Sequence, residues 1–259
     1  MHRPTEKNPL HSVVLAVVFS LLMNSWQGTF ALEESLSFEQ LIEELEDPDS
    51  DGCWDAINTL GLRGDKRAVP YLMTALEKDM IQRKGIAMAI IPALGQLGDK
   101  QAVPLLLKAL NNMDEDWLGR EAAAIALGEI GAAEAVPSLI RAAWLPETRN
   151  AAIEALASIG DPRATMVLLS TLDGQEDPEA QKAAIEGLMH IGKPAVPALI
   201  EKLERQSKEY PQDHQRALAA MILGEISDQR SIDPLTRALD DPSAEVRKSA
   251  DTALRKMTQ

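Results

Sequence analysis

The acidic stretch DPDSDG, which begins at Asp47, is the segment with the clearest potential for chemistry. Its carboxylates alternate with other residues at Asp47, Asp49 and Asp51, and Asp55 follows four residues later. This spacing is typical of loops that bind Ca²⁺ between two helices, because oxygen atoms at alternate positions can converge on one cation. The twelfth position of such a loop is normally a glutamate that supplies two oxygen atoms, and here it is Asn58. The same residues can instead cap helices, so we assign no metal site and keep calcium-modulated binding at this loop as an alternative.

Thiol and imidazole groups give little support for catalysis. Cys53 is the only cysteine, so no disulfide can form within the chain. We expect it to be a packing thiol, with a redox or intermolecular role as the alternative that an unpaired cysteine raises. His190 and His214 lie on expected helices, where we expect packed or solvated side chains rather than metal ligands. We therefore assign no catalytic residue and no cofactor.

These residues belong to a unit that recurs along the chain. The segment LGQLGDKQAVPLLLKAL, which starts at Leu94, reads as the end of one helix, a tight break and the start of a second helix. The break residues of the six copies are 29 to 35 residues apart, and they are Gly64, Gly98, Gly131, Gly160, Gly192 and Ser227. A period of this size is typical of a solenoid, in which each unit buries its apolar face only against its neighbours.

Each residue type in the unit has a structural role. A glycine such as Gly131 suits the left-handed backbone conformation that ends a helix. An aspartate follows the break in four units and is suited to accept from free amides at the next helix start; these residues are Asp65, Asp99, Asp161 and Asp228. A proline soon after it, such as Pro104, is tolerated because the first helical turn has no partner for that amide. We therefore predict an all-α fold, a right-handed α-solenoid of about six helix pairs with half-repeat caps.

Four further segments carry local predictions. Residues 37–46 read as a capping helix, because Ser37 and Gln40 have the spacing of a capping box. Pro92 is expected to kink or break the helix that contains it. The polar connection RQSKEYP at 205–211 is expected to be a surface loop, and 244–257 is expected to close the stack.

The repeated unit resembles the short HEAT repeats of phycobilisome-lyase-like proteins, whose pattern runs D-P-x-x-x-V-R-x-x-A-x-x-A-L-G-x-I-G-D-x-x-A-V-P-x-L. The first half of the pattern is matched by Asp241, Pro242, Val246, Arg247, Ala250 and Leu254. The part from the arginine onward is matched by Arg120, Ala123, Leu127, Gly128, Ile130, Gly131, Ala135, Val136 and Pro137. The resemblance covers residues 37–258 and implies the fold. It also raises a bilin-lyase-like enzyme or enzyme accessory as an alternative function.

A second group of similar proteins hydroxylates a lysine-derived residue and holds two irons with His-Glu pairs. No His-Glu dipeptide occurs in this sequence, so the resemblance does not extend to that chemistry.

Charge and the N-terminal segment restrict location and partners. The net charge is −14, and because residues 1–31 carry +1, residues 32–259 carry −15. Such a surface repels phosphate backbones, which argues against nucleic acid as a partner. Arg3 and Lys7 precede an apolar run and a T-F-A sequence ending at Ala31, which is the order of a signal peptide. We predict a signal peptide at 1–31 and a HEAT-like repeat domain at 32–259, exported to the periplasm or the extracellular space, with no membrane insertion after cleavage. An uncleaved anchor is the alternative, although the run is shorter than the roughly 20 apolar residues of a spanning helix.

The second helices of a solenoid usually line its concave side, so their exposed positions are the candidates for partner binding. The position four residues after the proline slot is expected to point outward, and it reads Thr74, Lys108, Arg141, Ser170, Glu201 and Arg237. Tyr71 and Leu105, next to the slot, are expected to edge this partly basic strip, and Trp144 is a candidate anchor. A solvated face with scattered charges explains the same residues.

A second row of arginines stands on the first helices at Arg120, Arg149, Arg216 and Arg247. Its regularity favours a structural ladder with acidic residues between repeats. The sequence as a whole predicts an exported, non-catalytic scaffold that binds a protein or peptide on its concave surface.

Overall fold

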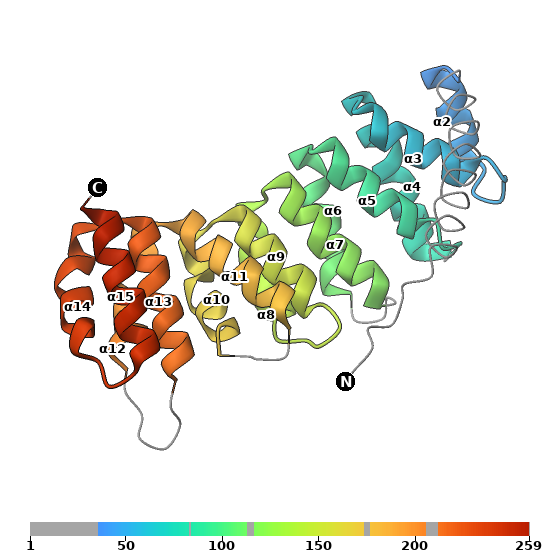
Figure 1. The fold of residues 1–259 in the computed structure, drawn as a ribbon. Coiled ribbons are helices and arrows are strands. Elements are labelled where there is room, and N and C mark those ends of the chain that lie inside the picture. The colour runs from blue at the N-terminus through green and yellow to red at the C-terminus, as the bar shows by residue number, and fades with distance from the viewer. Residues whose placement is uncertain (1–35, 83, 113–116, 174–176, 206–211, 259) are drawn as a thin grey trace, which may run out of the picture.

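A computed structural model describes residues 36–82, 84–112, 117–173, 177–205 and 212–258. The expected signal peptide at 1–31 and residues 206–211 of the expected loop lie outside the described residues. In the described part the chain is helical and its helices follow one another along an elongated, bent stack (Figure 1). None of these helices is long and apolar enough to cross a lipid bilayer.

Two kinds of helix alternate through six repeats. The first helices of the repeats are α3 (Cys53–Arg63), α5 (Ala87–Leu97), α7 (Trp117–Ile130), α9 (Arg149–Ile159), α11 (Pro178–Ile191) and α13 (Asp213–Ile226). The second helices are α4 (Val69–Gln82), α6 (Val103–Asn111), α8 (Val136–Ala142), α10 (Thr165–Thr171), α12 (Val196–Glu204) and α14 (Ile232–Arg237). The predicted order of helix pairs is therefore confirmed.

One helix at each end completes the stack. At the N-terminus, α2 (Phe38–Glu46) packs on α3 and α4, and so takes the place of a second helix without its partner. Its capping box is present, since Gln40 N donates to Ser37 Oγ over 3.2 Å and Ser37 N donates to Gln40 Oε1 over 2.8 Å. At the C-terminus, α15 (Ala244–Met257) packs on α13 and α14 in the place of a first helix. Both ends are the predicted half-repeats.

The turn within each repeat follows from the residues at the break. Gly64 has φ 66°, and Ser227 occupies the same left-handed region with φ 53°. A short 3-10 helix follows the turn in every repeat: η1 (Lys66–Ala68), η2 (Lys100–Ala102), η3 (Ala133–Ala135), η4 (Pro162–Ala164), η5 (Lys193–Ala195) and η6 (Gln229–Ser231). The predicted caps are confirmed, because a carboxylate accepts the backbone amide two residues on, over 2.9 to 3.0 Å, at Asp65, Asp99, Asp161 and Asp228.

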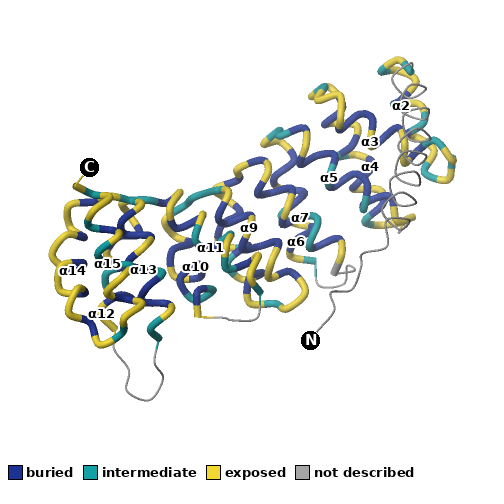
Figure 2. Tube along the Cα trace, in the orientation of Figure 1, coloured by how far each residue is buried: buried dark blue, intermediate teal, exposed yellow. Residues whose placement is uncertain are grey.

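The first helices pack closely on one another through most of the stack. From α3 to α11, and again between α13 and α15, consecutive first helices contact one another along their length. Between α11 and α13 only a few residues touch, and there α13 packs mainly on α12. At Gly128, an added Cβ would lie 2.7 Å from the Cα atom of Ala155 in the next first helix. Small residues thus let the backbones approach closely, and every repeat contributes buried segments to the stack (Figure 2).

The expectation of a break at Pro92 is wrong, because α5 continues through this residue. The proline removes the amide that would bond to the carbonyl of Met88. Its neighbours Ile90, Ile91 and Leu94 are completely buried, and their packing between repeats outweighs the lost hydrogen bond. A last short 3-10 helix, η7 (Ala238–Asp240), joins α14 to the turn before α15.

Candidate binding surface on the second helices

The second helices present the outward row that the sequence predicted. Thr74, Lys108 and Arg141 are exposed, as are Glu201 and Arg237. The sixth member, Ser170, is half-buried because it lines two hollows of the surface. The predicted direction of this row is therefore confirmed.

The adjoining row is different, and the prediction that Leu105 edges the surface is wrong. Leu105 is only 6% exposed, whereas Tyr71 is 47% exposed. Successive helical residues are rotated by about 100°, so this position turns toward the preceding second helix. Tyr71 contacts Phe38 of the short α2 edge to face, with ring centroids 6.1 Å apart. A full repeat precedes Leu105, and its packing covers the leucine.

Part of the basic strip holds neighbouring second helices together. The Arg141 guanidinium donates to Asn111 Oδ1 over 3.1 Å, which ties α8 to the end of α6. Arg237 pairs in the same way with Glu204 at the end of α12. Lys108 is exposed on α6, the helix that Arg141 contacts through Asn111. Some of these charged side chains thus position neighbouring helices, and others face solvent.

Two adjoining hollows lie along α10, and together we call them the central groove. The larger, of about 350 Å³, lies between α10, the turn after α8 and the starts of α9 and α11, and has an apolar wall that includes Ile153 and Val167. The smaller, of about 220 Å³, lies between α10 and α12. Ser170 and Asp173 line both hollows, so the two adjoin at these residues.

Large apolar side chains stand exposed at the central groove. Trp144, in the turn after α8, lines the larger hollow and is 60% exposed. Met166, at the start of α10, lines the smaller hollow and is 70% exposed. Exposed tryptophan beside an apolar wall is typical of sites that receive a side chain of a partner. The candidate anchor Trp144 therefore belongs to a shaped surface.

Charges of both signs surround the central groove. Lys202, whose side chain is 9% exposed, pairs with Asp173 on its floor. Arg149 and Asp177 lie at the larger hollow, and Glu201 at the smaller. The backbone amide of Ala180 and the Asn150 side chain hold the pKa of Asp177 below its ordinary value, so this carboxylate stays charged. The groove thus offers apolar contacts and fixed charges of either sign.

The structure does not gather the calcium candidates into a site. Asp47 Oδ1 accepts the amide of Asp49 over 3.1 Å, and both Asp49 carboxylate oxygens accept from Lys84 Nζ over 2.7 and 2.9 Å. Asp51 and Asp55 take no part in these contacts. Among the described residues, no three His, Cys, Asp or Glu side chains lie close enough to hold a metal ion. The acidic stretch is therefore a turn pinned by a lysine.

The thiol and imidazole groups occupy structural positions. Cys53 is completely buried. His190 Nδ1 lies 3.1 Å from the carbonyl oxygen of Ala157, and His214 Nδ1 lies 2.7 Å from Glu245 Oε1. Each histidine thus connects neighbouring first-helix positions.

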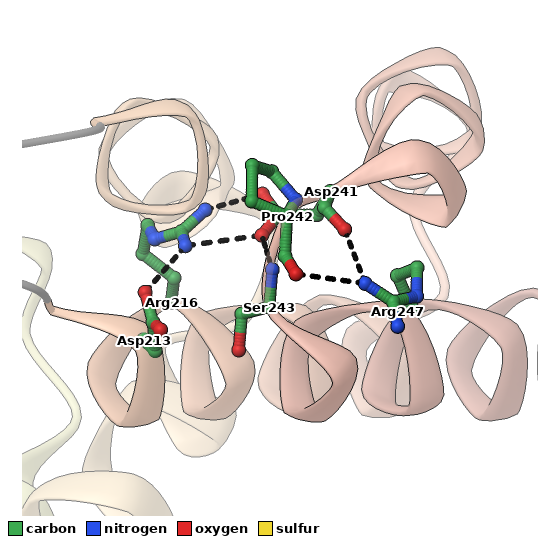
Figure 3. A network of polar contacts seen from close by, with 6 residues as sticks. All are labelled: Asp213, Arg216, Asp241, Pro242, Ser243 and Arg247. Carbon is green, nitrogen blue, oxygen red and sulfur yellow. Dashed lines mark hydrogen bonds and ion pairs between the residues drawn. The ribbon is translucent and has the colours of Figure 1, made fainter.

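The predicted arginine ladder is present at the C-terminal end (Figure 3). Arg216 pairs with Asp241 and also contacts Asp213 over 2.7 Å, and the Arg216 and Asp241 side chains are each 5% exposed. Arg247 donates to the carbonyls of Asp241 and Pro242 over 2.7 and 2.8 Å. The two arginines earlier in the row lie in other surroundings. Arg149 is exposed at the central groove, and Arg120 is buried.

Sequence reasoning missed two features of this surface. Met166 replaces the proline of the repeat, and an apolar residue at an outward position was the available signal. The arginine two residues after the capping aspartate was also missed, although it recurs. Arg163 and Arg230 donate to carbonyls of the preceding repeat, at Ala133 and Lys193, over 2.7 and 2.8 Å.

The fold and this surface define an α-solenoid of stacked helix pairs. A family model described as HEAT repeats matches residues 38–113, 82–148, 143–219 and 202–259, and the chain belongs to this family. A comparison with curated protein sequences gave no significant match.

Solved structures with the same arrangement include the complex of CpcE and CpcF of phycocyanin lyase from Nostoc sp. PCC7120. The match has 22% identity and a TM-score of 0.54, and covers 86% of this chain and 95% of that chain. Human deoxyhypusine hydroxylase in complex with glycerol matches with 21% identity and a TM-score of 0.43, over 89% of this chain and 98% of that chain. An engineered protein matches with 22% identity and a TM-score of 0.42, over 85% of this chain and 96% of that chain. The first of these likenesses supports the predicted repeat type and shows the fold alone.

Proposed function

We propose that the protein is a binding scaffold that holds an extended peptide segment of a partner in the central groove. The observation that carries this proposal is the pair of hollows that adjoin at Ser170 and Asp173, with Trp144 exposed at the larger one. An extended chain presents side chains at regular intervals, so apolar residues can enter successive hollows while its charged residues face the groove charges.

The proposed role is binding without catalysis. The groove is lined by the second helices α10 and α12 and by the starts of the first helices α9 and α11, so it includes part of the second-helix face, which we take as the concave side of the stack. The 22% identity to the phycocyanin lyase complex shows a shared fold, and a lyase activity would need residues that the likeness does not supply.

Selection from a random peptide library displayed on phage tests the groove. We expect selected peptides to bind the wild-type protein and to bind Trp144→Ala at least about tenfold more weakly, because truncating an anchoring tryptophan removes a large contact with the peptide. Trp54→Ala is the matched control, since Trp54 is 45% exposed on α3, in the first-helix layer. Equal binding to wild type and Trp144→Ala, or an equal loss in both variants, would reject the groove.

Charge reversal sharpens the same experiment. Lys108→Glu and Arg141→Glu change exposed side chains on α6 and α8, the second helices that precede the groove in the chain. We expect them to weaken binding of acidic selected peptides while thermal melting stays nearly unchanged, because surface pairs contribute about 0–1 kcal/mol. Unchanged peptide binding would exclude these two residues from the binding surface.

We also propose that the protein works outside the cytoplasm after removal of residues 1–31. The support is the order of basic, apolar and small residues in this segment. N-terminal sequencing of the protein from fractionated cells is expected to find a mature chain starting at Leu32 in the exported fraction. An intact N-terminus in the cytoplasmic fraction would contradict export.

A further inference from the structure

A pocket of about 280 Å³ lies at the N-terminal end of the stack, apart from the central groove. Its apolar walls come from α2 and from the start of the second repeat, with Ile42, Leu45 and Ile86 among them. The contact between Lys84 Nζ and Asp49 joins the segments on either side of it. We call this hollow the N-terminal pocket.

One of the residues that line the N-terminal pocket is a buried carboxylate. Asp79, at the end of α4, is only 5% exposed. Its Oδ2 atom accepts the backbone amide of Ala87 over 2.9 Å at the start of α5. Its Oδ1 atom has no hydrogen-bond partner among the residues that the structure describes. A buried carboxylate oxygen without a partner is costly, so this site favours a donor, above all a cation.

The sixth repeat shows what normally fills this position. Asp241 follows the second helix α14 as Asp79 ends the second helix α4, and Asp241 also accepts a backbone amide at the start of the next helix, from Ser243 over 2.9 Å. The difference is that the Arg216 guanidinium pairs with Asp241 (Figure 3). Asp241 is therefore satisfied from within the chain.

Repeat one lacks that arginine. Arg216 stands 11 residues before its break residue Ser227, and Cys53 stands 11 residues before Gly64. A thiol carries no positive charge and cannot replace a guanidinium. Burial raises the pKa of the Cys53 thiol, and the nearby carboxylates of Asp47, Glu44 and Asp79 add to the effect. The repeat position that carries a guanidinium in repeat six thus carries a neutral thiol in repeat one, and this thiol lies near carboxylates.

We infer that the N-terminal pocket binds a guanidinium group on an aliphatic stem, with the charged end against Asp79 and the stem against Ile42, Leu45 and Ile86. The bound ligand would give Asp79 the guanidinium partner that Asp241 receives from Arg216 of the same chain. Such a guanidinium can belong to an arginine of a partner peptide or to a free small molecule, and the chemistry of the pocket is the same for both. This site is distinct from the central groove, so an experiment can reject either proposal without affecting the other.

The backbone amide of Ala87 is a local reporter, because it bonds to Asp79 Oδ2. Amide NMR spectra would be recorded while n-butylguanidinium is added, with n-butylurea as the uncharged control of the same shape, at matched ionic strength. We expect a saturable shift of the Ala87 amide with the guanidinium and none with the urea. The pair N-acetyl-arginine methylamide and N-acetyl-citrulline methylamide then distinguishes a peptide side chain from a free guanidine. Tighter binding of the blocked arginine supports a peptide source, and equal or weaker binding supports a small molecule.

Variants connect the response to the proposed contact. Asp79→Asn keeps an acceptor for Ala87 and removes the charge, and it should weaken guanidinium binding at least about tenfold. Cys53→Arg places a guanidinium in the internal slot and should abolish the response; if this variant does not fold, Asp79→Asn alone decides. Lys78→Gln, which removes an exposed cation from the pocket lining, is the control and should bind at least as tightly as wild type. An Ala87 response that is absent in wild type, equal for the urea or unchanged in Asp79→Asn would overturn the inference.

Discussion

Repeat one and repeat six treat a carboxylate near the end of the second helix in opposite ways. In both, this aspartate accepts a backbone amide at the start of the next helix, Asp79 from Ala87 and Asp241 from Ser243. Asp241 is neutralised by Arg216 inside the stack, whereas Asp79 lines a pocket and its Oδ1 atom has no hydrogen-bond partner among the described residues. One difference between the two repeats is Cys53, which stands in place of an arginine. The repeat pattern thus builds the frame, and a departure from the pattern opens a site.

The turns of the two repeats differ in a second way. Arg67 pairs with Asp65 over 2.6 Å and lies 4.4 Å above the centre of the Phe38 ring. Arg230 pairs with Asp228 over 2.9 Å and also donates to the Lys193 carbonyl of the preceding repeat. The turn of repeat six is therefore tied to the preceding repeat by a polar contact, whereas the turn of repeat one meets the capping helix α2 on that side.

The largest effect is expected from breaking the internal pair of repeat six. Arg216→Met leaves Asp241 buried without its cation, and the free energy of unfolding should fall by about 3–5 kcal/mol. Urea unfolding measures this loss. Arg237→Gln, which removes an exposed pair with Glu204, is the control and should change stability by about 1 kcal/mol or less. Similar small losses in both variants would show that the Arg216 pair does not lock the last repeat.

A pH-dependent effect is expected at the turn of repeat six. The Arg230 side chain and amide lower the pKa of Asp228 to about 2 from its ordinary 3.8. A lowered folded-state pKa means that the carboxylate stabilises the fold above about pH 4 and loses this contribution as pH falls toward about 2. Asp228→Asn should therefore be less stable than wild type near neutral pH, and the difference should shrink over that acid range. A difference that does not change with pH in thermal melting would contradict the charge pairing.

The smallest effect is expected from neutralising the unpaired carboxylate of repeat one. Asp79→Asn keeps an acceptor for the Ala87 amide and removes a buried charge whose Oδ1 atom has no hydrogen-bond partner among the described residues. Its stability should stay within about 1 kcal/mol of wild type or rise slightly, since no ion pair among those residues is lost with the charge. Urea unfolding without added ligand is the measurement. A loss as large as that of Arg216→Met would mean that Asp79 has an internal partner.

The sequence predicted the frame better than the sites. The break residues and capping aspartates repeat in the sequence and act locally, so Gly64 and Asp228 could be placed from their neighbours in the chain. Leu105 and Pro92 were misjudged because their fate depends on packing against adjacent repeats, which no local pattern encodes. To predict the surroundings of Asp79, one would have needed to know that its side chain lies near Cys53, which is 26 residues earlier in the chain.

The central groove could not be predicted from the sequence either, because it is formed by contacts between repeats. Trp144 was recognisable as a candidate anchor from its residue type. That the two hollows adjoin at Ser170 and Asp173 follows only from how α10 lies against the neighbouring repeats. Residues at the same position of the repeat can therefore be core in one unit and surface in another.

Amide NMR mapping of a library-selected peptide on the wild-type protein is the most direct test of partner binding by the second helices. The account predicts that the largest shifts fall on groove residues such as Ser170, Asp173 and Ala198, with the exposed face of α3 around Trp54 unaffected. Shifts concentrated on the first helices, with the central groove unperturbed, would contradict it.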